Sequence, residues 1–268
     1  MSMNSKMNLD MVGGVNANDA PCAPLFAGAR ALALGGWLAL CATMPAQAIG
    51  IDSMLGYADE QGEAEFVITN SETYRQYINV AISEVTVTNG QLQKTPYTRA
   101  NLSDWALEVN PARTILEPGF KKGFALKYQP TGVWPQDRDR VFQVSFVPTP
   151  YFAEGETGNA VKMTFGFAPL LIVPAKETQP LAYEIRYRGD KVTVINKGNT
   201  FFTLYLDGCS KGTAPQDRKA CSVDATVLAG RELDVALPPA MQSRPTLQAK
   251  MASHGNKFKA QTTLSKQL

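Results

Sequence analysis

The alternation of apolar and polar residues is most pronounced over residues 161–173, V-K-M-T-F-G-F-A-P-L-L-I-V. In the first half, Val161, Met163, Phe165 and Phe167 alternate with small or polar residues. This period of two puts large side chains on one face of a β-strand. The second half is continuously apolar, which is typical of a strand that is covered on both faces.

A polar, glycine-rich run at residues 154–159, E-G-E-T-G-N, precedes this stretch and predicts a loop that leads into the edge of a sheet. Apolar edge strands invite pairing with other chains, so proteins usually interrupt them with charge, proline or a bulge. Lys162 is the only such interruption in the first half. Two interpretations remain open: an ordinary core strand of a β-sandwich, or a strand that is lent to a partner.

The chain before this stretch reads as short strands and turns without a helical period. Asn89-Gly90 is a strong signal for a hairpin turn. Apolar residues alternate, or cluster between turn residues, at 63–69, 78–82, 113–116, 124–128 and 141–147. About seven strands at regular spacing predict an immunoglobulin-like β-sandwich.

A second all-β unit follows a proline-bounded, charged segment at residues 174–180, P-A-K-E-T-Q-P. We therefore predict an N-terminal immunoglobulin-like domain over residues 49–176, which contains the lent strand, and a C-terminal one over residues 177–268. Strands of the second domain are expected at residues 183–187, 191–195, 201–206, 225–237 and 246–258.

The N-terminus resembles a secretion signal. Arg30 precedes an apolar run at residues 31–44, and Ala46-Gln47-Ala48 follows as a small-x-small cleavage site. We predict that residues 1–48 are an N-terminal extension and a signal peptide that is removed after Ala48. The apolar run is too short to span a bilayer, so no membrane anchor is predicted.

Two of the four cysteines, Cys22 and Cys41, leave with the predicted signal. The other two, Cys209 and Cys221, are twelve positions apart and most simply form one disulfide, worth roughly 3 kcal/mol through loop closure. A metal site needs more ligands, and no metal or cofactor is predicted. The single histidine, His254, lies in the polar run S-H-G-N-K and is expected to be a solvated loop residue.

The residue types argue against catalysis. One histidine, two disulfide cysteines and the lack of a G-x-S-x-G elbow leave no usual nucleophile and base set, so no catalytic residue is predicted. Asp137 and Asp139 lie in an arginine-rich loop and are expected to be surface partners of the arginines. The mature net charge stays at +2, which gives no reason to expect nucleic acid as a partner.

Several motifs in order along the chain resemble one family. They are Trp105 with N-P-A-R-T-I-L-E-P-G at residues 110–119, W-P-Q-D-R-D-R-V-F at 134–142, the strand that ends in Val173-Pro174-Ala175, and V-I-N-K-G-N-T at 194–200. Together they resemble the periplasmic pilus chaperones of the chaperone-usher pathway, in the alternate branch that serves coli-surface-antigen and common-pilus systems. The resemblance spans almost the whole mature chain, and Cys209 and Cys221 fall where this branch places a disulfide.

The resemblance implies a periplasmic chaperone that binds pilus subunits and delivers them to an outer-membrane usher. In this family a chaperone strand completes the sandwich of the subunit, a form of strand addition called donor-strand complementation. Val161, Met163, Phe165 and Phe167 would then fill successive pockets of the subunit. The alternative is a structural or adhesive pilus component with the same fold, and self-association of the free form is left open.

The chain departs from the family at the anchor for the carboxylate at the C-terminus of the subunit. Many members use an arginine on the first strand and a lysine late in the donor strand. Here Met54 and Pro169 stand near those positions, and neither can bind a carboxylate. Lys127 is the first candidate for a relocated anchor and Arg113, expected on a neighbouring strand, is the second, against the alternative that both are solvated surface charges.

Overall fold

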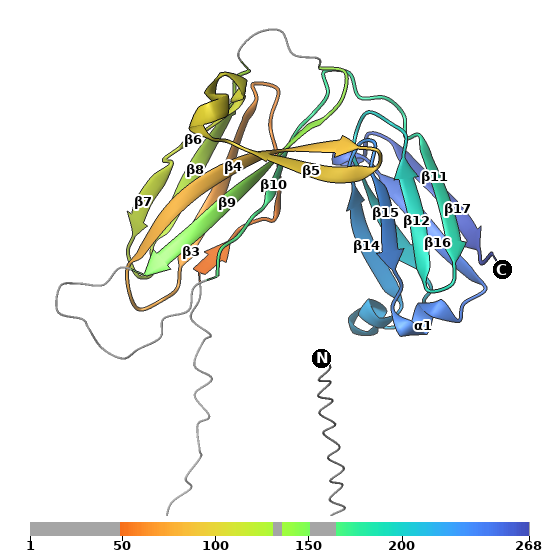
Figure 1. Cartoon of the computed structure of the whole chain (residues 1–268). Coiled ribbons are helices and arrows are strands. Elements are labelled where there is room, and N and C mark those ends of the chain that lie inside the picture. The colour runs from red at the N-terminus through yellow and green to blue at the C-terminus, as the bar shows by residue number, and fades with distance from the viewer. Residues whose placement is uncertain (1–48, 131–135, 151–164, 268) are drawn as a thin grey trace, which may run out of the picture. The chain divides into compact units, whose positions relative to one another are not determined.

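The structure is a computed structural model that describes residues 49–130, 136–150 and 165–267. Its strands form two groups along the chain, coloured orange to green and cyan to blue in Figure 1. The predicted signal segment, residues 1–48, lies outside the described residues. In the described part, no helix is both long and apolar enough to cross a membrane.

The first group of strands forms two sheets. One sheet has the order β1-β3-β8-β6, and the other has the order β2-β10-β9-β4-β5 with β7 also paired to β4. The strands of the first sheet are β1 (Ile49–Ile51), β3 (Glu63–Asn70), β8 (Lys121–Tyr128) and β6 (Leu107–Asn110). Those of the second sheet are β2 (Leu55–Tyr57), β10 (Leu170–Val173), β9 (Arg140–Pro150), β4 (Gln76–Thr88), β5 (Gln91–Pro96) and β7 (Arg113–Leu116).

Alternation along these strands fills the space between the two sheets. Phe66 on β3 and Phe124 on β8 are buried, and both contact the ring of Phe146 on β9 edge to face, with centroids 6.0 and 5.0 Å away. Such pairs stabilise a core beyond the area that they bury. The alternation predicted at residues 63–69, 124–128 and 141–147 is therefore confirmed. A short 3-10 helix, η1 (Arg99–Asp104), connects β5 to β6.

The second group of strands also forms two sheets around a core of its own. The sheet orders are β11-β12-β15 and β14-β13-β16-β17. The strands are β11 (Tyr183–Arg188), β12 (Lys191–Asn196), β15 (Glu232–Ala236), β14 (Ser222–Val227), β13 (Phe202–Asp207), β16 (Thr246–Ala252) and β17 (Lys259–Ser265). Short helices α1 (Pro239–Gln242), η2 (Pro215–Ala220) and η3 (His254–Asn256) connect them. The prediction of an all-β chain with two β-sandwich domains is confirmed.

The predicted disulfide between Cys209 and Cys221 is present, with the Cα atoms 4.9 Å apart, and it closes the loop between β13 and β14. Two strand predictions in this domain were wrong. Residues 225–237 form two strands rather than one, because Gly230 takes a left-handed turn with φ +79° between β14 and β15. Residues 246–258 end as a strand at Ala252, and β17 after them was not predicted.

A third apolar cluster joins residues from both groups of strands. It contains Val85, Val141 and Ile172 from the first group and Phe201 and Leu228 from the second. Apolar side chains on the outer face of a sheet are thereby removed from water, and this burial stabilises the contact between the two domains.

Asp139 lies beside this cluster and is only 7% exposed, so its prediction as a surface partner of arginines was wrong. Its carboxylate accepts hydrogen bonds from the backbone N–H groups of Ala175 (2.9 Å) and Phe201 (2.8 Å) and from the hydroxyl of Thr200 (3.0 Å). Buried carboxylates require such partners. A residue of the first domain therefore holds the connecting segment and the residues just before β13 of the second domain.

His254 is exposed, as expected of a loop residue, but it is not surrounded by solvent alone. Its ring packs in a tilted arrangement against Tyr57 of β2 with centroids 4.0 Å apart, and Phe201 stacks on the same tyrosine at 5.2 Å. Burial raises the pKa of the Tyr57 hydroxyl, so this side chain stays neutral and acts as an aromatic surface.

Candidate functional site

The two halves of the 161–173 stretch lie in different environments. β10, its second half, is paired with β9 on one side in antiparallel fashion and with β2 on the other side in parallel fashion. Leu171, Ile172 and Val173 are buried. The second half is therefore a covered strand, as its continuous apolar sequence predicted.

Residues 165–169, just before β10, are paired through the backbone on one side. Phe167 exchanges two backbone hydrogen bonds with Phe146 of β9, at 2.7 and 3.1 Å, and the Val144 N–H donates to Pro169 at 2.9 Å. On the other side, the pairing with β2 begins only at Leu170. Because alternate residues of a strand direct their N–H groups to opposite sides, Gly166 and Ala168 direct theirs away from β9. Neither N–H has a partner among the described residues.

Phe165 is 70% exposed, and Phe167 is half-buried. Val161 and Met163 lie outside the described residues. Phe165 has the same strand parity as Phe167, whose bridge partner Phe146 is a buried core residue. Phe165 therefore lies on the same face of the strand as Phe167, yet its side chain is exposed to solvent. The backbone next to it also has an unpaired edge.

Exposed large apolar side chains are unevenly distributed over the described part of the chain. All of them belong to the first domain: Met54, Leu92, Leu102, Ile115, Phe120, Val147 and Phe165. Phe165 is the most exposed of the seven. Unpaired backbone lies next to this phenylalanine, the most exposed of the seven, which identifies it as the centre of a candidate binding edge.

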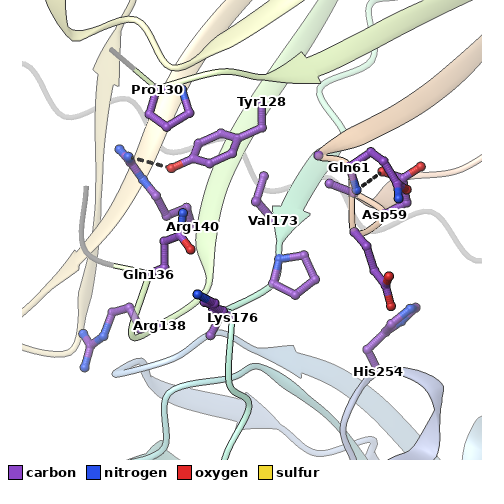
Figure 2. Close-up of a pocket in the computed structure, with 15 residues that line it drawn as sticks. Asp59, Gln61, Tyr128, Pro130, Gln136, Arg138, Arg140, Val173, Lys176 and His254 are labelled. Atoms are coloured by element: carbon purple, nitrogen blue, oxygen red, sulfur yellow. Dashed lines mark hydrogen bonds between the residues drawn. The ribbon is translucent and has the colours of Figure 1, made fainter. Parts of the chain in front are cut away.

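A cavity of about 850 Å³ opens at the other end of β10, where β10 runs into the connecting segment. Figure 2 shows Tyr128, Arg138, Arg140, Lys176 and His254 around it. The turn at residues 58–62, which carries Asp59 and Glu60, supplies the opposite wall. Cations and carboxylates thus face each other across this cavity.

Arg140 is the most strongly held cation in the cavity, with a side chain that is 12% exposed. Its guanidinium pairs with Glu84 of β4 and donates to the Tyr128 hydroxyl at 3.1 Å, a bond drawn in Figure 2. The guanidinium carbon lies 5.7 Å from the ring centroids of both Tyr128 and Phe142. Burial lowers the pKa of Arg140, but the bonds to Glu84 and Tyr128 outweigh it and the net shift is upward. Arg140 is therefore a fixed, permanently charged group.

The chain is similar in sequence to one family model and to one curated relative. Residues 51–174 match the family model "CS5 fimbrial protein N-terminal domain". The chain is also 27% identical over 168 residues to an Escherichia coli relative described as an uncharacterized 25.9 kDa protein in the CS5 3' region. That match covers 60% of this chain and 70% of the relative.

Solved structures share the fold of both domains together. A chain of the Salmonella enterica SafA pilin–SafB chaperone complex matches with a TM-score of 0.54 and 12% identity, over 82% of this chain and 96% of that one. The YadV chaperone matches with a TM-score of 0.52 and 10% identity, over 81% and 100%. A chain of the CsuC–CsuE pre-assembly complex from the archaic chaperone-usher Csu pili of Acinetobacter baumannii matches with a TM-score of 0.51 and 11% identity, over 82% and 100%. This chain has the pilus-chaperone fold.

The two basic residues predicted as carboxylate anchors lie on strands of different sheets. Lys127 lies on β8 and Arg113 on β7, which pairs with β4 in the other sheet, so the expected adjacency of their strands was wrong. The Lys127 ammonium already binds Glu63 at 2.7 Å and the Gln61 carbonyl at 3.0 Å. Arg113 is exposed beside Asn79. Neither residue lines the cavity in Figure 2.

Arg140 of the cavity was not among the site residues predicted from the sequence. A signal was present in D-R-D-R-V-F, where Arg138 and Arg140 alternate immediately before a predicted strand. Alternation puts both side chains on one side. What the sequence lacked was the register that brings Glu84 and Tyr128 next to Arg140.

Proposed function

We propose that this protein is a periplasmic chaperone that binds pilus subunits by donor-strand complementation and delivers them to an outer-membrane usher. The observation that carries the proposal is the exposed Phe165 next to the half-paired backbone of residues 165–168. A strand of the subunit added to this edge gains main-chain hydrogen bonds from the free N–H groups and a register from the alternating side chains. The action is binding, and no chemical step is involved.

The side chains proposed to enter the subunit are Val161, Met163, Phe165 and Phe167, which share one parity. Burial of a phenylalanine or a similar side chain contributes about 1.5 to 3 kcal/mol before the cost of ordering the segment.

The direct test is co-expression with pilus subunits. Wild-type protein is expected to co-purify with a subunit in a one-to-one periplasmic complex, and Phe165→Asp is expected to abolish this complex. Leu102→Asp is the matched control, because Leu102 is also 60% exposed and lies in η1 rather than at the free edge. Equal complex yields from Phe165→Asp and wild type would overturn the proposal.

Fibre composition separates a chaperone from a structural or adhesive pilus component. A chaperone releases its subunit, so antibodies against this protein are expected to detect it in periplasmic extracts and not in purified surface fibres. Stoichiometric presence in the fibres would contradict the chaperone function.

The cavity in Figure 2 is the proposed place for the carboxylate at the C-terminus of the subunit. Arg140 supplies a fixed charge, and the exposed Lys176 supplies a second cation at the end of β10. Charge-assisted bonds of this kind fix the end of a bound strand. Lys127 and Arg113 remain the alternative anchors.

A peptide with the C-terminal sequence of the pilus protein distinguishes these anchors. The free-acid peptide is expected to bind more tightly than its amide, and Lys176→Gln is expected to remove that difference. Lys127→Gln and Arg113→Gln serve as charge-matched comparisons. If either of them removes the difference while Lys176→Gln does not, the anchor lies there and the cavity is excluded.

A further inference from the structure

A second concave surface lies on the C-terminal domain. It is a depression of about 490 Å³ on the outer face of the β14-β13-β16-β17 sheet. Residues from β13, β16, β17 and η3 line it, among them Thr203, Tyr205, Lys250, Ala252 and Lys259.

The cross-strand register explains the depression. One row across the sheet contains Thr203, Ala252 and Lys259, and the next row contains Tyr205, Lys250 and Gln261. Paired residues point to the same face with Cβ atoms about 5 Å apart. Small side chains at positions 203 and 252 therefore form a floor, and the longer side chains around them form walls.

The two lysines in these walls lack acidic partners. Within the part of the chain that the structure describes, no ion pair or hydrogen bond involves the ammonium group of Lys250 or Lys259. Some cations of this domain are instead paired with carboxylates, for example Lys191 with Asp234 and Lys197 with Glu184. The lysines of the depression thus retain their full charge toward solvent.

Two carboxylates on the same face of the sheet, Asp207 and Asp224, do not cancel this charge. Asp207 is bound to the Arg218 guanidinium at 2.6 Å, and the same guanidinium donates to the Tyr205 hydroxyl at 3.3 Å. Asp224 pairs with Tyr205 across β14 and lies on the side of the tyrosine away from Lys250. The tyrosine ring therefore separates the cationic side of the row from the acidic side.

Charge is also distributed unequally between the two domains. Residues 177–268 contain thirteen Lys and Arg against eight Asp and Glu, whereas residues 49–176 contain eleven against fourteen. A surplus of cations on one domain steers acidic partners toward that domain over distances of about a Debye length. The depression lies on the domain with the surplus.

We propose that this depression is a docking site for an acidic segment of a partner protein. A carboxylate side chain would lie between the Lys250 and Lys259 ammonium groups, and the neighbouring part of the segment would pack on the Tyr205 ring above Ala252. A depression of this volume accommodates a few side chains, which favours a peptide segment over a broad anionic membrane surface. The site shares no residue with the proposed subunit-binding edge, so it stands or falls independently of that function.

The test uses the mature full-length protein and a fluorescein-labelled octapeptide of alternating Glu and Ser, with a Gln-Ser octapeptide as the neutral probe. Fluorescence anisotropy at low ionic strength is expected to show binding of the acidic peptide only. The double variant Lys250→Gln/Lys259→Gln is expected to weaken binding at least fivefold. The control Lys211→Gln/Lys219→Gln removes the same charge from exposed positions in the cysteine loop and is expected to change binding less than twofold.

A second variant separates the shape of the site from its charge. Ala252→Phe fills the floor without altering any charge, and it is expected to weaken peptide binding at least threefold. Equal weakening by the two double-lysine variants would reduce the effect to net charge and overturn the site. Binding to vesicles that contain phosphatidylglycerol, with no binding of the peptide, would overturn the proposed protein partner.

Discussion

The carboxylate of Asp139 accepts a hydrogen bond from the backbone N–H of Phe201 at 2.8 Å, so a residue at the start of β9 in one sandwich holds the beginning of β13 in the other. Asp139 is also a donor to the second sandwich, because its backbone N–H donates to the Asn199 carbonyl at 2.9 Å. Asn199 in turn donates its side-chain amide to the Asp137 and Glu177 carbonyls. The connection between the domains is therefore clamped from both sides by side chains.

This clamp predicts a specific stability effect. Asp139→Ala removes the acceptor of three buried donors, and each unsatisfied donor costs about 1 to 3 kcal/mol. Water can reach part of the opened site and satisfy some of these donors. We therefore expect the free energy of unfolding of the protein, measured by urea denaturation, to fall by about 2 to 4 kcal/mol. Asp137→Ala is the control, because only its backbone carbonyl takes part in the clamp. Equal effects of the two variants would contradict the role given to the Asp139 carboxylate.

The free edge depends on a close backbone approach at Gly166. A Cβ atom added there would lie 2.7 Å from the Phe146 carbonyl oxygen, which no side chain tolerates without movement of the segment. Gly166→Ala is therefore expected to detach residues 165–168 from β9. We expect a tenfold or greater loss in yield of the complex with the subunit, with a change of at most about 1 kcal/mol in stability, because the segment lies at the edge of the core.

Gly50→Ala provides the matched control for this substitution. Gly50 also lies on a strand, and the nearest atom to an added Cβ is the Cβ of Thr69 at 4.0 Å, an ordinary contact. Binding of the subunit is expected to be unchanged in this variant. Normal complex formation by Gly166→Ala would show that the pairing of Phe167 with Phe146 is not needed for binding.

The sequence predicted those features that are encoded locally. The turn at Asn89-Gly90 was predictable because both residues favour the positive φ that they adopt. β17 was missed because Ala260 and Leu264 are the only apolar residues in K-A-Q-T-T-L-S, and its pairing with β16 decides its structure. The exposure of Phe165 followed from the pattern of alternation and the polar run before it.

Features that depend on tertiary structure were not predictable in the same way. Asp139 reads as a surface residue in D-R-D-R, but its partners Ala175 and Phe201 lie 36 and 62 positions away. Likewise, the sequence around these residues does not indicate that Glu63 forms an ion pair with Lys127 or that Glu84 forms one with Arg140. Such pairings follow from strand register, which sequence periodicity does not determine between distant strands.

The ion pair of Arg140 and Glu84 is expected to be energetically coupled. Their side chains are 12% and 20% exposed, so removal of one charge leaves the other poorly solvated. Arg140→Met is expected to cost about 2 to 3 kcal/mol, and Arg140→Met/Glu84→Gln to cost less than the sum of the single variants by about 1 to 2 kcal/mol. A double-mutant cycle by chemical denaturation measures this coupling. Tyr128→Phe removes only the weaker hydrogen bond to Arg140, so its loss in stability is the reference against which the loss in Arg140→Met is compared. Strict additivity of the Arg140 and Glu84 substitutions would refute the coupling.

The last prediction concerns pH and the exposed cluster around Glu184. Hydrogen bonds from Lys197 (2.7 Å) and from Arg186, together with the charges of both groups, lower the pKa of the Glu184 carboxyl from 4.5 to about 2. A group whose pKa is depressed in the folded state binds its proton more weakly than in the unfolded chain. Its contribution to stability is therefore present above pH 4.5 and is lost as the pH falls toward 2. The measurement is an NMR titration of the Glu184 carboxyl carbon, which is expected to show the low pKa in the wild type and a rise toward 4.5 in Lys197→Gln. Lys191→Gln disrupts the separate ion pair with Asp234 and is expected to leave the pKa of Glu184 unchanged. A Glu184 titration that is the same in wild type and in Lys197→Gln would show that the exposed pair is screened by water and does not perturb the carboxylate.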